Sequence, residues 1–250
     1  MLVERAFVSE ALLEGQDVDA WPFTVPCVSQ LVSEGMAFSA PVTFLVGENG
    51  SGKSTLVEAI AEAFGLDAYG GRAGRKYGND RPKTALGEVM KLDYTSAGSR
   101  MQRGPRNKKK GFFLRAETAF GLLATVSGMP GYWEEDVTAQ SHGEGFLTVF
   151  AAQFGEPGLF VLDEPEGALS FTSCLQLVAL MHDLAKTGAQ VICSTHSPIL
   201  AATPGADIIE IGEHGFHTTT WEELELVDHW RRYLNNPNAY LRHLTTDEEE

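Results

Sequence analysis

Short runs of apolar residues alternate along this chain with segments in which apolar residues recur at helical spacing. Three of the runs are 42–46, 159–162 and 191–193, and the first is followed by the helical pattern of residues 53–64. Runs that are apolar at nearly every position are typical of strands in a parallel sheet covered on both faces. The alternation therefore predicts an α/β fold with a mostly parallel sheet.

The same reading predicts the other elements of a single domain over residues 1–250. Further strands are expected at 2–8, 112–114, 190–194 and 208–211, and further helices at 118–126, 143–154, 173–186, 221–234 and 237–244. Residues 70–110 are rich in turn residues and lack clear periodicity, which predicts an exposed loop or arm. The acidic end, about residues 245–250, is expected to be a frayed tail.

A phosphate-binding loop lies between the first apolar run and the helix that follows it. The segment Gly47-Glu48-Asn49-Gly50-Ser51-Gly52-Lys53-Ser54 has the GxxxxGK[ST] spacing in the strand–loop–helix context that such a motif requires. Glycines let the backbone wrap closely around a phosphate, and N–H groups at the start of a helix point at the anion. The expected nucleotide-binding residues are Gly47, Glu48, Asn49, Gly50, Ser51, Gly52, Lys53, Ser54 and Thr55.

Two carboxylates follow the buried run 159–162. In a protein with a phosphate loop, a carboxylate at the end of a neighbouring strand holds Mg²⁺ together with the loop hydroxyl, which predicts Asp163 and Ser54 as metal ligands. Glu164 is one residue further along and is expected to activate the water that attacks the γ-phosphate. The alternative is a strand exit with two solvated charges. The expected activity is Mg²⁺-dependent hydrolysis of a nucleoside triphosphate, with Lys53 on the β- and γ-phosphates.

A histidine follows the apolar run 191–193 in the segment Ser194-Thr195-His196-Ser197. Ligands of open α/β sheets bind at the carboxyl ends of the strands, where His196 is expected to lie. It is therefore expected to hydrogen-bond the γ-phosphate, the alternative being a structural hydrogen-bonding histidine.

Composition and charge indicate the cellular location and the kind of partner to expect. The three cysteines have no metal-ligand or disulfide spacing, so we expect a reducing, cytoplasmic location. No stretch approaches the ~20 consecutive apolar residues of a membrane span, and the start of the chain does not read as a signal peptide. The net charge is −15, yet residues 72–115 carry 13 Lys and Arg against three Asp and Glu. A basic block of this kind is a candidate contact for nucleic acid.

Four motifs together resemble those of the ABC-type ATPases, in particular the soluble branch of structural-maintenance-of-chromosomes-like and recombination-type ATPases. They are Phe112–Glu117, Ser141–Glu144, Leu162–Glu166 and Ser194–Pro198. The resemblance extends over nearly the whole chain, and a small family of bacterial predicted AAA/ABC-type ATPases resembles it most. It implies a P-loop NTPase fold of the ABC-type ATPase head, with ATP as the nucleotide and a small helical subdomain at about residues 118–157.

The resemblance also implies a dimer in which two heads enclose two nucleotides. Ser141, His142, Gly143 and Glu144 resemble the signature motif that contacts the nucleotide of the partner subunit. His142 occupies a position that is normally glycine. The alternative is a helix N-cap at Ser141, with Glu144 completing a capping box.

Further roles follow from the resemblance or stay open. Glu117 stands at the position of a metal-linked glutamine and is expected to ligate Mg²⁺ or its water, and 166–170 resembles the loop that crosses the dimer interface. Trp21 or Phe23 is a candidate for stacking on adenine, with core packing as the alternative.

Three alternatives stay open for what such a head acts on or with. The first is nucleic acid, bound through the basic arm from Arg72 to Lys110. The alternative for this segment is an arm that is solvated and binds nothing. The second is a separate effector protein, as in a defence or toxin–antitoxin complex. The third is a membrane transporter, for which the chain would be the motor subunit.

Overall fold

The computed structural model describes residues 1–68, 70–73, 82–104, 110–115, 147–148, 150–151 and 157–242. The expected helical subdomain at about 118–157 and the acidic tail at 245–250 lie almost entirely outside these residues.

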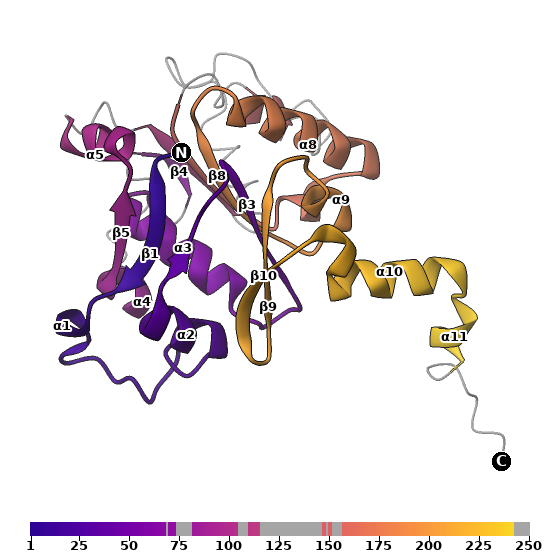
Figure 1. The fold of residues 1–250 in the computed structure, drawn as a ribbon, viewed down its shortest axis with the longest axis horizontal. Coiled ribbons are helices and arrows are strands. Elements are labelled where there is room, and N and C mark those ends of the chain that lie inside the picture. Colours follow the sequence, from indigo (N-terminus) through magenta and orange to yellow (C-terminus); the bar gives the residue numbers. More distant parts are fainter. Residues whose placement is uncertain are drawn as a thin grey trace.

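The centre of the molecule is a seven-stranded sheet in the order β10-β9-β3-β8-β7-β6-β4 (Figure 1). Its strands are β3 (Val42–Gly47), β4 (Gly71–Arg72), β6 (Gly111–Arg115), β7 (Leu159–Asp163), β8 (Gln190–Thr195), β9 (Asp207–Gly212) and β10 (Gly215–Thr219). The strands from β9 to β6 are all parallel, and β10 and β4 pair antiparallel at the two edges. The predicted mostly parallel sheet is confirmed.

A second, antiparallel sheet has the order β2-β1-β5. Its strands are β1 (Val3–Val8), β2 (Met36–Ala37) and β5 (Met90–Tyr94). The helix α3 (Lys53–Phe64) contacts β5 as well as β7 and β8, so it lies between the two sheets. Residues of both sheets and of α3 share one hydrophobic core.

The other face of the large sheet has its own hydrophobic core. Val42, Phe44 and Val46 of β3 pack there against α8 (Phe171–Ala185) and α9 (Pro198–Ala201), whereas Leu45 packs on the side of α3. Because successive side chains of a strand point to opposite faces, a nearly all-apolar strand fills both cores. This is why the central runs of the sequence show no polar alternation.

The expectation of an exposed arm over 70–110 is wrong for residues 85–103. This segment forms α4 (Ala85–Val89), β5 and α5 (Ser96–Arg103), and Leu86, Val89, Met90 and Leu92 are buried. Each helix is capped by a threonine side chain, Thr84 for α4 and Thr95 for α5. Elements of five to eight residues are too short to show a helical period, so the turn residues dominated the reading.

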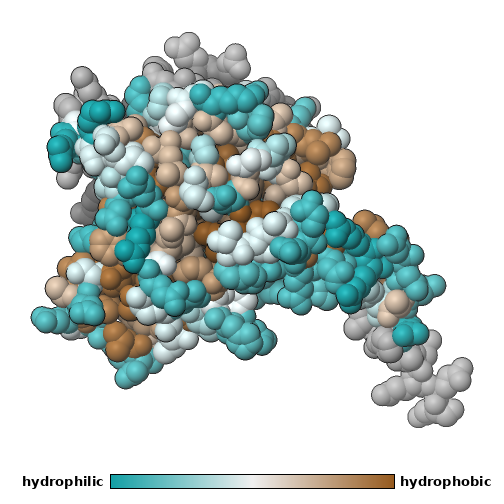
Figure 2. Space-filling model, in the orientation of Figure 1, coloured by the Kyte–Doolittle hydropathy of each residue, from teal (hydrophilic) through white to brown (hydrophobic). Residues whose placement is uncertain are grey.

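The remaining elements are helices outside the two sheets. They are α1 (Glu10–Leu13), α2 (Pro26–Glu34), η3 (Pro165–Ala168), η4 (Trp221–Glu223), α10 (Glu225–Asn235) and α11 (Asn238–Leu241). The predicted helix 221–234 is divided at Leu224, whose side chain is fully buried in the second core. Beyond it, α10 and α11 project from the body (Figure 1), and the face of α10 visible in Figure 2 is largely hydrophilic. No helix within the described residues is long and apolar enough to span a membrane.

Candidate nucleotide-binding site

The phosphate loop connects β3 to α3, as its sequence predicts. Gly52, the residue before the helix, has a φ of 100°, a left-handed conformation that favours glycine. Lys53 is the first residue of the helix, and its side chain is almost completely buried. Its Nζ donates a hydrogen bond to the Glu48 carbonyl at 2.8 Å, which folds the lysine back over the loop. Burial lowers the pKa of Lys53, and the nearby carboxylates oppose that shift, Glu164 most strongly.

The loop rests on the start of α2 through a cysteine. Cys27 is fully buried, and its Sγ donates to the Ser51 carbonyl at 3.1 Å. A Cβ at Gly52 would lie only 2.6 Å from this sulfur, so the two segments are in close contact. Burial raises the pKa of Cys27 to about 11, which keeps the thiol protonated as a donor. Because the carbonyl and N–H of one peptide point in opposite directions, this contact turns the Gly52 N–H away from α2.

Asp163 ends β7 in a polar network of three strands. It is paired in register with Ser194 of β8, whose Oγ donates to its Oδ1 at 2.6 Å. Arg115 at the end of β6 places its Nε 3.8 Å from the other oxygen of Asp163, and its Nη1 3.1 Å from Glu58 of α3. Burial raises the pKa of Asp163, while hydrogen bonds from Ser194 and Ser54 and the charge of Arg115 act in the opposite direction.

Glu164 follows with a left-handed backbone, φ 51° and ψ 52°, which is rare for a residue with a Cβ. Its N–H is held by Ser194, at 3.1 Å from the carbonyl and 3.2 Å from Oγ. Its Oε1 lies 2.8 Å from Nε2 of His196 and 3.9 Å from Nζ of Lys53. The three residues expected to carry catalysis therefore meet around one carboxylate oxygen.

The donor set at this edge fits Mg²⁺. Ser54 hydrogen-bonds the carboxylate of Asp163, so a hydroxyl and a carboxylate, both hard oxygen donors, lie together beside the phosphate loop. The carboxylate is buried and its pKa is raised, so a cation would relieve the cost of its charge. The described residues contain no cluster of three or more His, Cys, Asp or Glu side chains suited to a metal.

Some predicted site residues lie outside the described part of the chain. These are Glu117 and the signature residues Ser141, His142, Gly143 and Glu144, and their roles stay predictions. Of the two aromatic candidates, Phe23 is packed in the core, whereas the Trp21 side chain is 69% exposed.

Sequence reasoning missed the residues that support the site. Ser194 had a signal, because a polar residue ending a buried strand beside another that ends in Asp163 should meet it across the sheet. Arg115 stood inside a recognised motif without a role. Cys27 had no signal, since its contact to Ser51 joins segments 24 residues apart.

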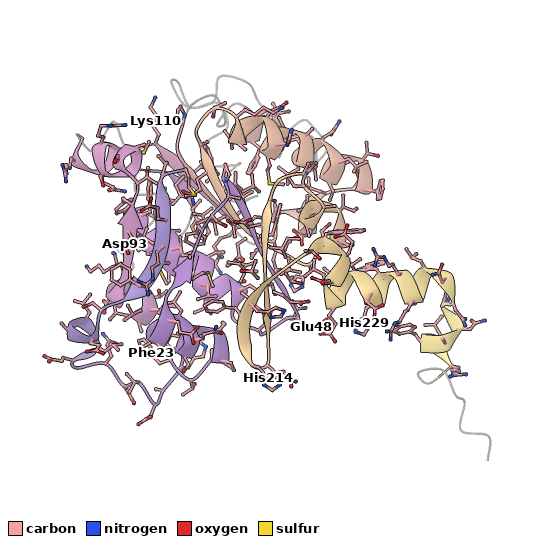
Figure 3. The ribbon with its side chains drawn as sticks, in the orientation of Figure 1. Phe23, Glu48, Asp93, Lys110, His214 and His229 are labelled. Atoms are coloured by element: carbon pink, nitrogen blue, oxygen red, sulfur yellow. The ribbon has the colours of Figure 1, made fainter. Side chains whose placement is uncertain are left out.

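A cavity of about 1490 Å³ opens beside the phosphate loop. It lies between the loop residues Gly47–Ser51, helix α2 and the turn that joins β9 to β10. Figure 3 shows Glu48 and His214 on neighbouring parts of its border. Its inner wall is fixed by Gln30, whose side chain bonds both the N–H and the carbonyl of Phe216. A ligand with phosphates in the loop has room here for its nucleoside part.

Comparisons with known proteins agree with this geometry. Residues 33–118, which include the phosphate loop, match a family model described as an AAA domain. The chain is 24% identical over 249 residues to the ATP-dependent permease PDR12 of Saccharomyces cerevisiae, covering 84% of this chain and 16% of the permease. It is 28% identical over 179 residues to the zinc import ATP-binding protein ZnuC of Paracoccus denitrificans, covering 69% of this chain and 65% of ZnuC.

Among solved structures, an inward-facing putative metal-chelate type ABC transporter aligns with a TM-score of 0.50 at 13% identity, covering 94% of this chain and 89% of that chain. The loop, the carboxylate pair and the strand order define a P-loop NTPase. Within that class, the fold is that of an ABC-type ATPase head, and the sequence is similar to the zinc import ATP-binding protein ZnuC. The chain spans only about one sixth of the length of the yeast permease.

Proposed function

We propose that this protein hydrolyses ATP with Mg²⁺ and that it does so as a dimer in which two heads enclose two nucleotides. The observation that carries the proposal is the meeting of Lys53, Glu164 and His196 at the carboxyl edge of the sheet. Each of these side chains matches one requirement of the reaction: a cation for the phosphates, a base for water and a hydrogen-bonding group for the γ-phosphate.

In the proposed reaction the loop N–H groups and Lys53 bind the phosphates, and His196 donates to a γ-phosphate oxygen. A water oxygen attacks the γ-phosphorus, the bond from that phosphorus to the bridging oxygen breaks, and ADP leaves. Glu164 accepts the proton of the attacking water. Before this, the nucleotide must replace the contacts that Glu164 makes with Lys53 and His196 in the ligand-free protein.

Ser54 and Asp163 are the residues that would hold the metal ion. When bound, Mg²⁺ supplies positive charge that offsets the negative charge of the β- and γ-phosphates. Arg115 and Ser194 keep the Asp163 carboxylate in place for this role.

The test uses Glu164→Gln, which keeps the shape of the side chain and removes its basicity. We expect steady-state ATP hydrolysis to fall by about 100-fold or more, while the variant still binds ATP·Mg²⁺ and doubles its mass in solution. The control is Glu222→Gln on the exposed η4. Hydrolysis that survives Glu164→Gln would remove the catalytic assignment. A variant that binds ATP·Mg²⁺ and stays a monomer would remove the dimer.

The signature residues have their own test. We expect Ser141→Arg to abolish ATP-dependent dimerisation, because a bulky cation would stand where a partner's nucleotide is bound. ATP binding by the monomer should persist. A dimer that still forms would exclude the trans role of Ser141.

A second candidate is a nucleic-acid interface, favoured by the position of the described cations. Arg100 and Arg103 are exposed in the last turn of α5, and Lys110 precedes the amino end of β6. Figure 3 shows Lys110 at the top of the body and Glu48 well below it, near the middle of the view. Nucleic acid bound here would leave the nucleotide site open.

The corresponding experiment measures anisotropy of a labelled DNA duplex across a salt series. Arg100→Glu with Arg103→Glu should weaken binding about tenfold or more and flatten its salt dependence. Arg231→Glu with Arg232→Glu on α10 is the matched control. Equal effects of both pairs, or no binding by the unchanged protein, would exclude a specific basic surface.

A third candidate is the motor subunit of a membrane transporter, favoured by the sequence similarity to an ATP-dependent permease and to a zinc import ATP-binding protein. Full hydrolysis by the isolated homodimer, unchanged by detergent-solubilised membranes of the source cell, would argue against it.

A further inference from the structure

A carboxylate in η3 binds the residue that precedes His196 and the backbone of His196 itself. Oε1 of Glu166 accepts hydrogen bonds from Thr195 Oγ1 at 2.6 Å and from the His196 N–H at 2.5 Å. Thr195 Oγ1 in turn accepts from the Ser197 N–H at 2.9 Å. One oxygen thus orders three consecutive residues at the end of β8.

The environment makes these bonds strong. Oε2 of Glu166 is buried and has no hydrogen-bond partner within the part of the chain that the structure describes. The carboxylate is partly buried, and a hydrogen bond gains strength where water competes less for the acceptor. The bonds from Thr195 and His196 to Oε1 therefore hold this side chain in place.

His196 is held at two points by one short segment. Glu166 fixes its backbone, and Glu164 contacts its ring through Nε2. Between them, Pro165 limits the backbone, and Gly167 N–H bonds the Glu164 carbonyl. The segment and the histidine are thus connected through both the backbone and the ring of His196, and the position of that backbone determines where the ring meets Glu164.

We propose that Glu166 is a positioning residue that sets the orientation of His196 toward the γ-phosphate. The inference rests on the proposed ATPase function and deepens it. Glu166 acts through His196, so its loss should lower the rate of hydrolysis and leave ATP binding, which depends on the loop and Lys53, nearly unchanged. Glutamine keeps an oxygen acceptor at the same place and should support the histidine where alanine cannot.

The test compares Glu166→Ala, Glu166→Gln and Glu223→Ala. Glu223 is the matched control, because it also lies in a short 3-10 helix, η4, where it accepts a hydrogen bond from the capping residue Thr220 away from the site. We expect Glu166→Ala to lower kcat about tenfold or more with KM for ATP within about threefold, which is the pattern of an interaction needed in the transition state. Glu166→Gln should recover most of the rate, and Glu223→Ala should change nothing.

A double-mutant cycle separates positioning from a general structural role. In a His196→Ala background, Glu166→Ala should cause little further loss, because the residue it orients is gone. An equal loss in both backgrounds, or full activity of Glu166→Ala, would overturn the proposal. A loss shared by Glu166→Gln together with a lowered Tm would also overturn it, since it would indicate folding damage.

A second readout does not depend on hydrolysis. The Nε2 and Cε1 NMR signals of His196, assigned with His196→Ala, should shift in ligand-free Glu166→Ala and keep their positions in Glu223→Ala. Unmoved signals would exclude positioning. If the unchanged protein binds but does not hydrolyse ATP, the proposed function fails while this readout still decides the role of Glu166.

Discussion

Gln190, the fully buried first residue of β8, binds the backbone of Val3 in the other sheet. Its Oε1 accepts from the Val3 N–H at 2.7 Å and its Nε2 donates to the Val3 carbonyl at 2.9 Å. The same oxygen accepts from Leu2 N–H at 2.8 Å. The side-chain amide of Gln190 thus makes the pair of hydrogen bonds that a neighbouring strand would make with Val3. It joins the two sheets although the two residues are 187 positions apart in the sequence.

We expect Gln190→Met to destabilise the fold without touching the nucleotide site. The methionine has similar volume but leaves two N–H groups and one carbonyl without this partner, and each unsatisfied buried group costs about 1–3 kcal/mol. A loss of roughly 2–4 kcal/mol in the free energy of unfolding should be seen by urea denaturation. Gln16→Met in the exposed loop after α1 is the control, and equal stabilities of the two variants would contradict the bridging role.

Asp163→Asn should raise the stability of the ligand-free protein while impairing Mg²⁺-dependent function. Burial raises the pKa of Asp163, so its charged form costs folding free energy near neutral pH, and Arg115 keeps its ion pair with Glu58 when that charge is removed. A Tm increase of about 2 °C or more is therefore expected by calorimetry. Ser194 can still donate to the asparagine oxygen. A lower Tm would mean that the ion pair with Arg115 offsets the full cost of burying the charge of Asp163.

The pH dependence of that difference follows from the raised pKa of Asp163. The folded state holds the proton more tightly than the unfolded state, whose pKa stays near the ordinary 3.8. The contribution of Asp163 to the free energy of unfolding is therefore largest at low pH. It declines as the pH rises from 3.8 through the pKa of Asp163 in the folded protein. The Tm of Asp163→Asn relative to the unchanged protein should increase over the same interval, and a constant difference would contradict the shift.

Cys27 should affect phosphate binding through the Ser51 carbonyl. We expect Cys27→Ala to lower the affinity for ATP about tenfold, because the Ser51 carbonyl loses its hydrogen-bond donor and a cavity opens beneath the loop. Isothermal titration calorimetry measures this affinity. Cys27→Ser restores a donor and should bind better than Cys27→Ala. Cys174→Ala, a buried cysteine of the second core, is the control. Equal affinities in all variants would show that the loop keeps its shape unaided.

Gly87 in α4 should not tolerate alanine. A Cβ there would lie 1.8 Å from Oε2 of Glu62, the carboxylate that accepts from the N–H and hydroxyl of Thr84. The clash would displace Glu62 and the cap of α4, with an expected loss of about 1–3 kcal/mol in a thermal or urea melt. Gly212→Ala meets nothing within 4 Å and serves as the control. A stable Gly87→Ala would show that Glu62 can move at little cost.

The site residues that the sequence predicts are those placed by a local pattern of apolar and polar residues. The phosphate loop, Asp163, Glu164 and His196 each follow a buried strand, and parallel strands bring their carboxyl ends to one edge. The elements of residues 85–103 are not predicted by the sequence pattern, because short capped elements carry little periodicity. Gln190 looked like one more strand residue, because its partner Val3 lies at the far end of the chain.

Helix α3 begins with Lys53 and has nine of its twelve residues buried between the two sheets. Its amide hydrogens can therefore exchange with solvent only when the whole core opens, so their exchange rates measure global unfolding. A nucleotide held at its first turn should slow that exchange along the entire helix, by about 100-fold when the ligand is at 100 times its Kd. Deuterium uptake in a peptide from α3 would therefore rank candidate nucleotides by affinity, and no assay of hydrolysis would be needed.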